Sequence, residues 1–366
     1  MLDPFTGCGT VQVQANKLGW TSHGYDPHPV FFRIASAKAM AFKLSPDLPK
    51  IYSAISKGIE APVSISTLEE KPREFLSKLF ERSVLEMLLG AKASLSHAKV
   101  ASNHLSFLIL SKMIDLCSKS QTDGIYKAPT STKRAERPSV ALDRVYSMIL
   151  EDMKTLSPNE CSIINKSSKT MSETGDGGIS SIITSPPYLN NFDYAEMTRM
   201  YLYFWGIAES WGDITDKVRV SQIVNTTTSL KGHKQRQEEY RTSLSSNVRQ
   251  GADEIVSLLQ AERQVRAGKR EYDFLVYPYF SQMQNVLREC LRVLNTGGRF
   301  HMMVADAALY GVHVPSPQIL AQIMKDAGFE NVSCELVRKR GHRWILDKRD
   351  GSKTGLGEYY VYGERN

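Results

Sequence analysis

Four consecutive residues, Ser185, Pro186, Pro187 and Tyr188, form the clearest chemical pattern in the sequence. They follow Ile179 to Thr184, a short apolar stretch typical of a buried parallel strand. A Pro-Pro pair cannot donate to a sheet, so it ends the strand and holds the residues on either side in a fixed relation. The Ser185 hydroxyl and the Pro186 carbonyl can then accept hydrogen bonds from an exocyclic amine, while Tyr188 stacks on the attached base. The amine needs little more than alignment with a sulfonium methyl group to react. A plain strand-to-loop turn is the structural alternative.

A glycine-rich turn opens the chain and has the features of a cofactor-binding turn. Its residues are Asp3, Pro4, Phe5, Thr6, Gly7, Cys8, Gly9 and Thr10. A turn of this kind between a strand and a helix lets a ligand approach the backbone and meet its N–H groups. Asp26, followed by Pro27 and His28, ends a second predicted strand, where its carboxylate can accept hydrogen bonds from two ribose hydroxyls. The alternative role for Asp26 is to cap the next helix. Together the two features favour a nucleoside-containing cofactor.

The elements that position these motifs follow an alternating order. Met1-Leu2 is expected to end a strand, 11–18 to form a helix, 22–25 a strand and 30–42 a helix. Strands are predicted again at 162–165 and 179–184. A helix over 277–294, a turn at 295–298, a strand at 299–304, a helix at 317–327 and strands at 332–339 and 358–362 complete the series. This alternation is typical of a doubly wound α/β domain.

Two stretches interrupt the series. We predict a catalytic domain from 1–44, 159–206 and 272–366, a helical insertion at 45–158 that is a candidate for target recognition, and a second insertion at 207–271 with a basic loop and a charged helix. Apolar residues between 75 and 110 recur at helical spacing, with no alternating strand pattern. The polar, basic and proline-containing segment 121–138 is expected to be an exposed loop.

Further residues are candidates for contact with a base or with nucleic acid. Asn191, Phe192 and Tyr194 directly follow the Pro-Pro motif, and either ring could stack on a flipped base. Aromatic residues at the start of a core helix are the equally weighted alternative. The basic candidates are Lys231, Lys234, Arg236 and Arg343, with Trp344 between basic residues. Any one basic group is more often a solvated surface, so they count only together. His313 is expected to be structural.

The motifs resemble those of the amino-methyltransferases of DNA. Residues 3–10 resemble the cofactor motif of that family, 24–29 its second motif, and 185–188 its catalytic tetrapeptide. The resemblance covers about 1–42, 160–206 and 272–366. It implies a Rossmann-like α/β fold of the class I S-adenosylmethionine-dependent methyltransferases, with a mostly parallel seven-stranded sheet whose last strand is antiparallel. It also implies S-adenosyl-L-methionine (SAM) as cofactor and double-stranded DNA as substrate. The Ser-Pro-Pro-Tyr form favours N4 of cytosine over N6 of adenine.

The sequence departs from the family pattern in two places. An acidic residue that often touches the cofactor adenine in this family is replaced here by the stretch 165–168. The contact is therefore either missing or made by a serine hydroxyl, with Ser167 as the candidate, or by the backbone. The family segment that holds the methionine end of the cofactor precedes the first motif, and here the chain begins on the motif itself. A truncated start, a relocated segment or a partner chain would each account for this, and the first and third are favoured.

Composition sets the remaining expectations. Among 366 residues, 42% are hydrophobic and 23% charged, and the net charge of +7 modestly suits a polyanionic partner. Five scattered cysteines without a CxxC pair indicate a reducing cytoplasm and no metal site. No apolar run reaches transmembrane length and no signal peptide is evident, so we expect an intracellular protein. The leading hypothesis is a DNA methyltransferase of restriction-modification or defence. An RNA base methyltransferase and a subunit that is inactive without a partner are the alternatives.

Overall fold

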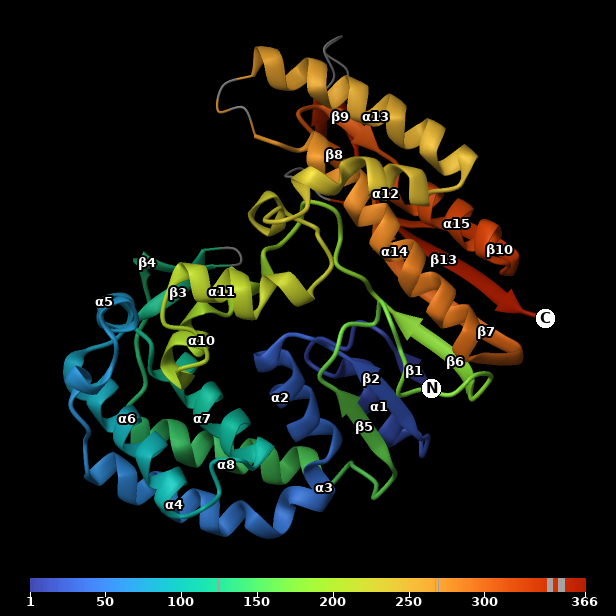
Figure 1. Ribbon diagram of the computed structural model, residues 1–366. Coiled ribbons are helices and arrows are strands. Elements are labelled where there is room, and N and C mark those ends of the chain that lie inside the picture. The colour runs from blue at the N-terminus through green and yellow to red at the C-terminus, as the bar shows by residue number, and fades with distance from the viewer. Residues whose placement is uncertain (124–125, 267, 269, 341–344, 348–352) are drawn as a thin grey trace. The chain divides into compact units, whose positions relative to one another are not determined.

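A computed structural model describes residues 1–366 except 124–125, 267, 269, 341–344 and 348–352. The chain divides into two compact units (Figure 1). Unit 1 contains Met1–Phe5, Lys166–Asp193 and Arg219–Asn366, and unit 2 contains Thr6–Asn165 and Tyr194–Val218. No helix within the described ranges is both long and apolar enough to cross a membrane.

Unit 1 is built on five hydrogen-bonded strands in the order β10-β13-β7-β6-β1. Their bounds are β1 Leu2–Asp3, β6 Ile179–Thr184, β7 Leu294–Ala305, β10 Glu330–Lys339 and β13 Gly357–Arg365. The strands β1, β6 and β7 are mutually parallel, with Leu2 opposite Ile182 and Thr184 opposite Met302. The last strand, β13, lies between β7 and β10 and runs antiparallel to both. Because parallel strands end at the same edge, the residues after β1, β6 and β7 gather there.

Four helices and two small hairpins complete unit 1. The helices are α12 Gln237–Ser243, α13 Ser246–Val265, α14 Asp273–Val293 and α15 Ser316–Ala327, with 3₁₀ turns at Arg219–Ser221, Thr227–Ser229 and Lys234–Arg236. The hairpins pair β8 Ala307–Leu309 with β9 Val312–Val314, and β11 Ile345–Asp347 with β12 Lys353–Gly355. In Figure 1, α14 and α15 lie beside β7, β13 and β10, and helix-to-helix and helix-to-strand contacts join them.

A proline inside α14 is accommodated by a side chain of the preceding segment. Pro278 has no N–H, so the carbonyl of Phe274, four residues earlier, loses its helical donor. The Gln237 side-chain amide donates to that carbonyl at 3.2 Å. The long helix therefore continues past the proline, and its next residue, Tyr279, takes part in the candidate site described below.

Unit 2 combines two parallel strands with a helical assembly. β2 Ser22–Tyr25 pairs with β5 Cys161–Ile164, with Tyr25 opposite Ile164. The helices before β5 are α1 Thr10–Lys17, α2 Pro29–Ala39, α3 Ala41–Leu44, α4 Leu48–Glu60, α5 Glu70–Leu79, α6 Arg82–His97, α7 His104–Cys117 and α8 Pro138–Met153, with 3₁₀ turns at Ser45–Asp47 and Ile65–Thr67. The later helices are α9 Tyr194–Met197, α10 Arg199–Trp205 and α11 Trp211–Lys217. One apolar cluster joins α2, the helices α4–α8 and the later segment, through residues such as Ile55, Leu88 and Phe204.

The observed elements confirm most of the α/β series and correct parts of it. The expected antiparallel last strand is β13, which runs opposite to its neighbours β7 and β10. The sheet is therefore mostly parallel but of mixed orientation. The helical insertion is not purely helical, since β3 Ser120–Asp123 and β4 Tyr126–Thr132 form a hairpin where a loop was expected. The expected turn at 295–298 is included in the long strand β7. The assignment of 45–158 and 207–271 as insertions stays a prediction.

Candidate active site

The Pro-Pro motif lies directly after β6, as the sequence predicts. Ser185 is exposed, Pro186 is buried, and Tyr188 is half-buried, with its hydroxyl 3.4 Å from the Ser185 hydroxyl. Thr184, the last residue of the strand, is buried and donates to the Asp3 carboxylate at 2.7 Å. The Ser185 side chain is thus presented to solvent from a strand end that is itself fixed.

Tyr188 lies among charged residues of the neighbouring strands. Burial raises the pKa of its phenol, the nearby Glu358 carboxylate adds to this, and Arg340 and Arg338 oppose it. Arg338 is ion-paired with Glu358 at 2.5 Å. The ring is therefore neutral at physiological pH, which suits stacking on a base.

Tyr279 of α14 fixes the backbone of the same motif. Its hydroxyl donates to the carbonyl of Pro187 at 3.0 Å, and the Tyr279 ring is fully buried. A fully buried aromatic side chain has little freedom, so this contact ties the carbonyl to the packed helix.

The segment after Tyr188 is held by a residue of the later chain, Asn225. The side-chain amide of Asn225 donates to the carbonyl of Phe192 at 2.8 Å and lies 3.4 Å from the carbonyl of Tyr188. The main-chain carbonyl of Asn225 accepts from the N–H of Asn190 at 2.6 Å. Asn190 has a φ of 52°, a left-handed conformation that few residues other than glycine adopt without support. Asn191 forms part of the same loop, where its N–H lies 3.3 Å from the Tyr188 carbonyl.

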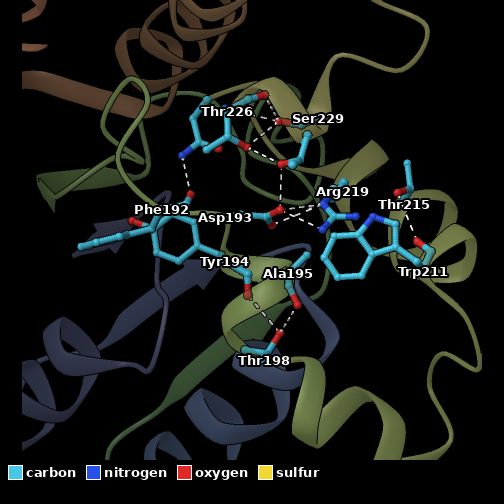
Figure 2. A network of polar contacts seen from close by, with 12 residues as sticks. Phe192, Asp193, Tyr194, Ala195, Thr198, Trp211, Thr215, Arg219, Thr226 and Ser229 are labelled. Atoms are coloured by element: carbon cyan, nitrogen blue, oxygen red, sulfur yellow. Dashed lines mark hydrogen bonds and ion pairs between the residues drawn. The ribbon is translucent and has the colours of Figure 1, made fainter. Parts of the chain in front are cut away.

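A buried ion pair closes this segment (Figure 2). The Arg219 guanidinium donates to Asp193 Oδ2 from Nη2 at 2.8 Å and from Nε at 3.0 Å. The side chains are 2% and 6% exposed, respectively. The Thr228 hydroxyl also donates to Asp193 Oδ2, at 2.7 Å. With several donors on one carboxylate, the pair meets the requirement that a buried charge be both paired and hydrogen-bonded.

The glycine-rich turn and Asp26 come together in unit 2. Asp26 Oδ2 accepts from the N–H of Gly7 at 2.8 Å, and Oδ1 accepts from the N–H of His28 at 2.8 Å. The carboxylate thus joins the turn to His28, the residue that caps α2, so Asp26 is not itself the N-cap that was weighed as the structural alternative. A carboxylate has about four acceptor positions. The predicted ribose role of Asp26, a residue that is 8% exposed, stays a prediction.

Two glycines make the close packing of this turn feasible. Gly9 has a φ of 82°, and a Cβ there would lie 3.1 Å from the Ala35 Cα of α2. A Cβ on Gly24, in β2, would lie 2.2 Å from the Thr6 hydroxyl. Residues at these positions with side chains would displace the turn from the strand and helix that shape it.

His28 has a structural role that its predicted cofactor contact did not anticipate. The ring is fully buried, its Nδ1 accepts from the Val30 N–H at 3.2 Å, and its Nε2 lies 2.8 Å from the Thr198 hydroxyl. It is the N-cap of α2. We therefore correct the prediction for this side chain: its ring caps a helix inside unit 2 and is not exposed for a ligand.

Asp3 belongs to unit 1 and is almost completely buried. Its Oδ1 accepts from the N–H of Phe5 at 3.0 Å as well as from Thr184. Burial raises its pKa to about 6, against the lowering effect of these two bonds. Ser167, the predicted adenine contact, is half-buried, and its hydroxyl lies 3.5 Å from the N–H of Lys169. The cofactor roles of the turn residues and of Ser167 stay predictions.

The predicted basic contacts divide into three cases. Lys234 is paired with Glu271 at 2.5 Å and Arg236 with Glu239 at 2.6 Å, so nearby carboxylates already balance both charges. Lys231 is exposed. Arg343 and Trp344 lie outside the residues that the structure describes.

The predicted target residues 185–188 thus lie within unit 1, and Gly7 and Asp26 of the predicted cofactor residues meet within unit 2. Sequence reasoning missed Thr184, Asn225 and Tyr279, which hold the target half in place. Only Thr184 had a local signal, because it is the polar last residue of an otherwise apolar strand end.

Known proteins show similarity to this chain at low identity. The chain is 22% identical, over 98% of its length and 77% of the relative's, to the type II methyltransferase M.BsoBI of Geobacillus stearothermophilus. It is 28% identical to the type II methyltransferase M.AvaI of Anabaena variabilis, over 44% of this chain and 32% of the relative. The comparisons confirm the resemblance to DNA methyltransferases that the two motifs indicate. No protein-family model matches the chain.

A solved structure adds no further assignment. An SAM-dependent methyltransferase from Methanosarcina mazei aligns with 100% of this chain and 91% of its own, at 8% identity and a TM-score of 0.33. That score is too low to establish a shared fold.

Proposed function

We propose that the chain is an SAM-dependent methyltransferase that modifies an exocyclic amino group of a base in double-stranded DNA, with N4 of cytosine favoured over N6 of adenine. The observation that carries the proposal is the Thr184–Asp3 hydrogen bond within unit 1, 2.7 Å long. It joins the first residue of the glycine-rich motif to the strand end that presents Ser185. The type II methyltransferase relatives support the same activity and a role in restriction-modification.

The residues around the turn fit the proposed cofactor. Gly7 and Gly9 both have a positive φ, of 51° and 82°, and the turn leads into the N-terminus of α1. This arrangement suits the close approach of a nucleoside-containing ligand. Asp26 follows β2 and joins the turn to the start of α2 through the Gly7 and His28 amides, at the place where a carboxylate of this fold class meets ribose hydroxyls. SAM, when bound, supplies the activated methyl group.

The target half would align the amine. The base rotates out of the duplex, the ring of Tyr188 stacks on it, and the Ser185 hydroxyl and Pro186 carbonyl accept hydrogen bonds from its amino group. Tyr279 and Asn225 keep the backbone of this motif in one conformation. Alignment of this kind supplies much of the rate acceleration in a simple displacement.

The test is methyl transfer from SAM labelled in its methyl group to unmethylated duplex DNA, followed by digestion and chromatography of the nucleosides. We expect label in N4-methylcytosine. Label in N6-methyladenine would change the target base, and label only in structured RNA offered in parallel would replace DNA as the substrate. Absence of transfer together with absence of saturable SAM binding would overturn the proposal. Saturable SAM binding without transfer would instead point to a required partner.

A further inference from the structure

Asn225 contacts the loop 188–192 at three places. The Asn225 side chain is 6% exposed, and it reaches both ends of the loop through the carbonyls of Tyr188 and Phe192. The Asn225 main chain meets the middle of the loop at the N–H of Asn190. Asn225 therefore contacts three of the five loop residues, namely Tyr188, Asn190 and Phe192.

The loop needs such support because its local geometry is unfavourable. Asn190 lies in the left-handed region at a φ of 52°, a conformation that persists only where the surroundings impose it. Without Asn225 the part-buried carbonyl of Phe192 would also lose the hydrogen bond of 2.8 Å from this side chain.

The residues after Asn225 are themselves fixed. Thr226 and Ser229 form a reciprocal capping arrangement around the 3₁₀ turn Thr227–Ser229, and the Ser229 hydroxyl donates to the Thr226 carbonyl at 2.8 Å (Figure 2). Thr228 of the same turn donates to Asp193. On the other side, the Gln282 side chain of α14 accepts from the N–H of Val224 at 2.9 Å. Asn225 therefore has a rigid base on both sides.

We infer that Asn225 is a positioning residue for the target base: it sets the conformation of the loop that carries Tyr188 and Phe192, and so the orientation of the two rings toward a flipped base. The inference rests on the proposed function. It gives part of the stretch 207–271 a role in the chemistry of methyl transfer in addition to any role in reading DNA. Asn225 acts through the loop and makes no contact with the reacting atoms.

The test compares Asn225→Ala and Asn225→Asp with a matched control, Gln284→Ala. Gln284 is 3% exposed and also donates a buried side-chain hydrogen bond to a backbone carbonyl, that of Ser243 at 2.9 Å, but it has no contact with the loop. Asn225→Asp keeps the size of the side chain and removes both amide donors. Each protein is assayed for kcat, for KM, for SAM affinity and for the fluorescence of 2-aminopurine placed at the target base, which reports unstacking.

We expect both Asn225 variants to lower kcat by about 10- to 100-fold and to change the 2-aminopurine signal, because small misplacements of reacting groups have effects of this size. SAM affinity should stay within about twofold of the wild type in all three variants. Gln284→Ala should keep the wild-type kcat even if it lowers the unfolding temperature equally. Wild-type kcat and fluorescence in a folded Asn225→Asp protein would overturn this inference and leave the proposed function intact. The same conclusion would follow if Gln284→Ala lowered kcat as much as the Asn225 variants do. Absence of methyl transfer by the wild type would overturn the proposed function itself.

Discussion

The Thr184 hydroxyl donates to the Asp3 carboxylate at 2.7 Å and so joins the ends of two neighbouring parallel strands, β6 and β1. Both residues are buried, with Asp3 3% and Thr184 4% exposed. The residue after Thr184 is the predicted amine acceptor, and the residues after Asp3 form the predicted cofactor turn. A single buried hydrogen bond therefore links the two strand ends from which the motifs start. One of its two partners is the titratable carboxyl group of Asp3.

Asp3→Asn should remove a pH-dependent loss of stability. Burial raises the pKa of Asp3 from 3.8 to about 6. Since the folded state disfavours the ionised form, this contribution to stability is fully present below about pH 4 and is lost as the pH rises through about 6. We expect the wild type to lose up to about 3 kcal/mol relative to Asp3→Asn over this range. Urea unfolding of both proteins at several pH values measures the difference, and a constant difference would contradict the assignment.

Asp26→Ala should weaken SAM binding by more than about tenfold, because the Gly7 and His28 amides would lose their shared acceptor and the turn its shape. The orphaned N–H groups should also cost about 1–3 kcal/mol of stability each where they stay buried. Equilibrium binding of SAM and urea unfolding are the two measurements. As a control for SAM affinity, Asp143→Ala removes an exposed carboxylate that accepts from the Tyr52 hydroxyl elsewhere in unit 2, and it should leave SAM affinity unchanged. Equal SAM affinity in Asp26→Ala and wild type would exclude Asp26 from the cofactor site.

Substitutions at Tyr188 should separate stacking from hydrogen bonding. Tyr188→Phe keeps the ring and loses only a 3.4 Å contact with the Ser185 hydroxyl, so near-wild-type transfer is expected. Tyr188→Ala should weaken base stacking by about 1–3 kcal/mol. Ser185→Ala should lower kcat without this loss of stacking. Because burial raises the pKa of the Tyr188 phenol, its titration should not affect the rate between about pH 7 and 9. Unchanged transfer in the Ser185→Ala, Tyr188→Ala double variant would refute the site.

Removal of one member of the Asp193–Arg219 pair should strongly destabilise the protein. Asp193→Ala leaves a buried guanidinium without its carboxylate, and we expect a loss of about 3–5 kcal/mol in the free energy of unfolding. Asp193→Leu combined with Arg219→Met should recover most of this loss, because no buried charge then remains.

The exposed pair of Glu151 and Lys154 serves as control for this experiment. Its side chains are 73% and 69% exposed, so Glu151→Ala should cost less than about 1 kcal/mol. If chemical unfolding gave equal losses for Asp193→Ala and Glu151→Ala, the buried pair would have no special role in stability.

The sequence predicts the strand-borne half of the site well, and the reason is local. The stretch from Ile179 to Thr184 is apolar at most positions, and two prolines come one residue after it, which favours a strand that ends there; the structure has β6 with those bounds. The β3–β4 hairpin was not predictable in the same way. Its residues are mostly polar or basic and include Pro129, so they carry no apolar alternation.

Asn225 and Arg219 have no local signature in the sequence. Asn225 follows Phe192 by more than thirty residues, and Arg219 follows Asp193 by 26, so neither helical nor strand periodicity relates the partners. Their pairing depends on how the chain packs, which composition and spacing do not contain. For His28 the local sequence was misleading. Its position in a motif suggested a ligand contact, whereas its ring is buried and caps α2.

The ion pair between Asp193 and Arg219 also has a topological meaning. These are the residues at which the chain leaves unit 1 and returns to it, with Tyr194–Val218 between them. Since the two ends of this excursion meet through a 2.8 Å contact, the entropic cost of closing it depends only weakly on its length. The excursion also contributes buried residues such as Phe204 to the apolar core of unit 2, so that packing constrains its sequence even though its two ends meet in unit 1.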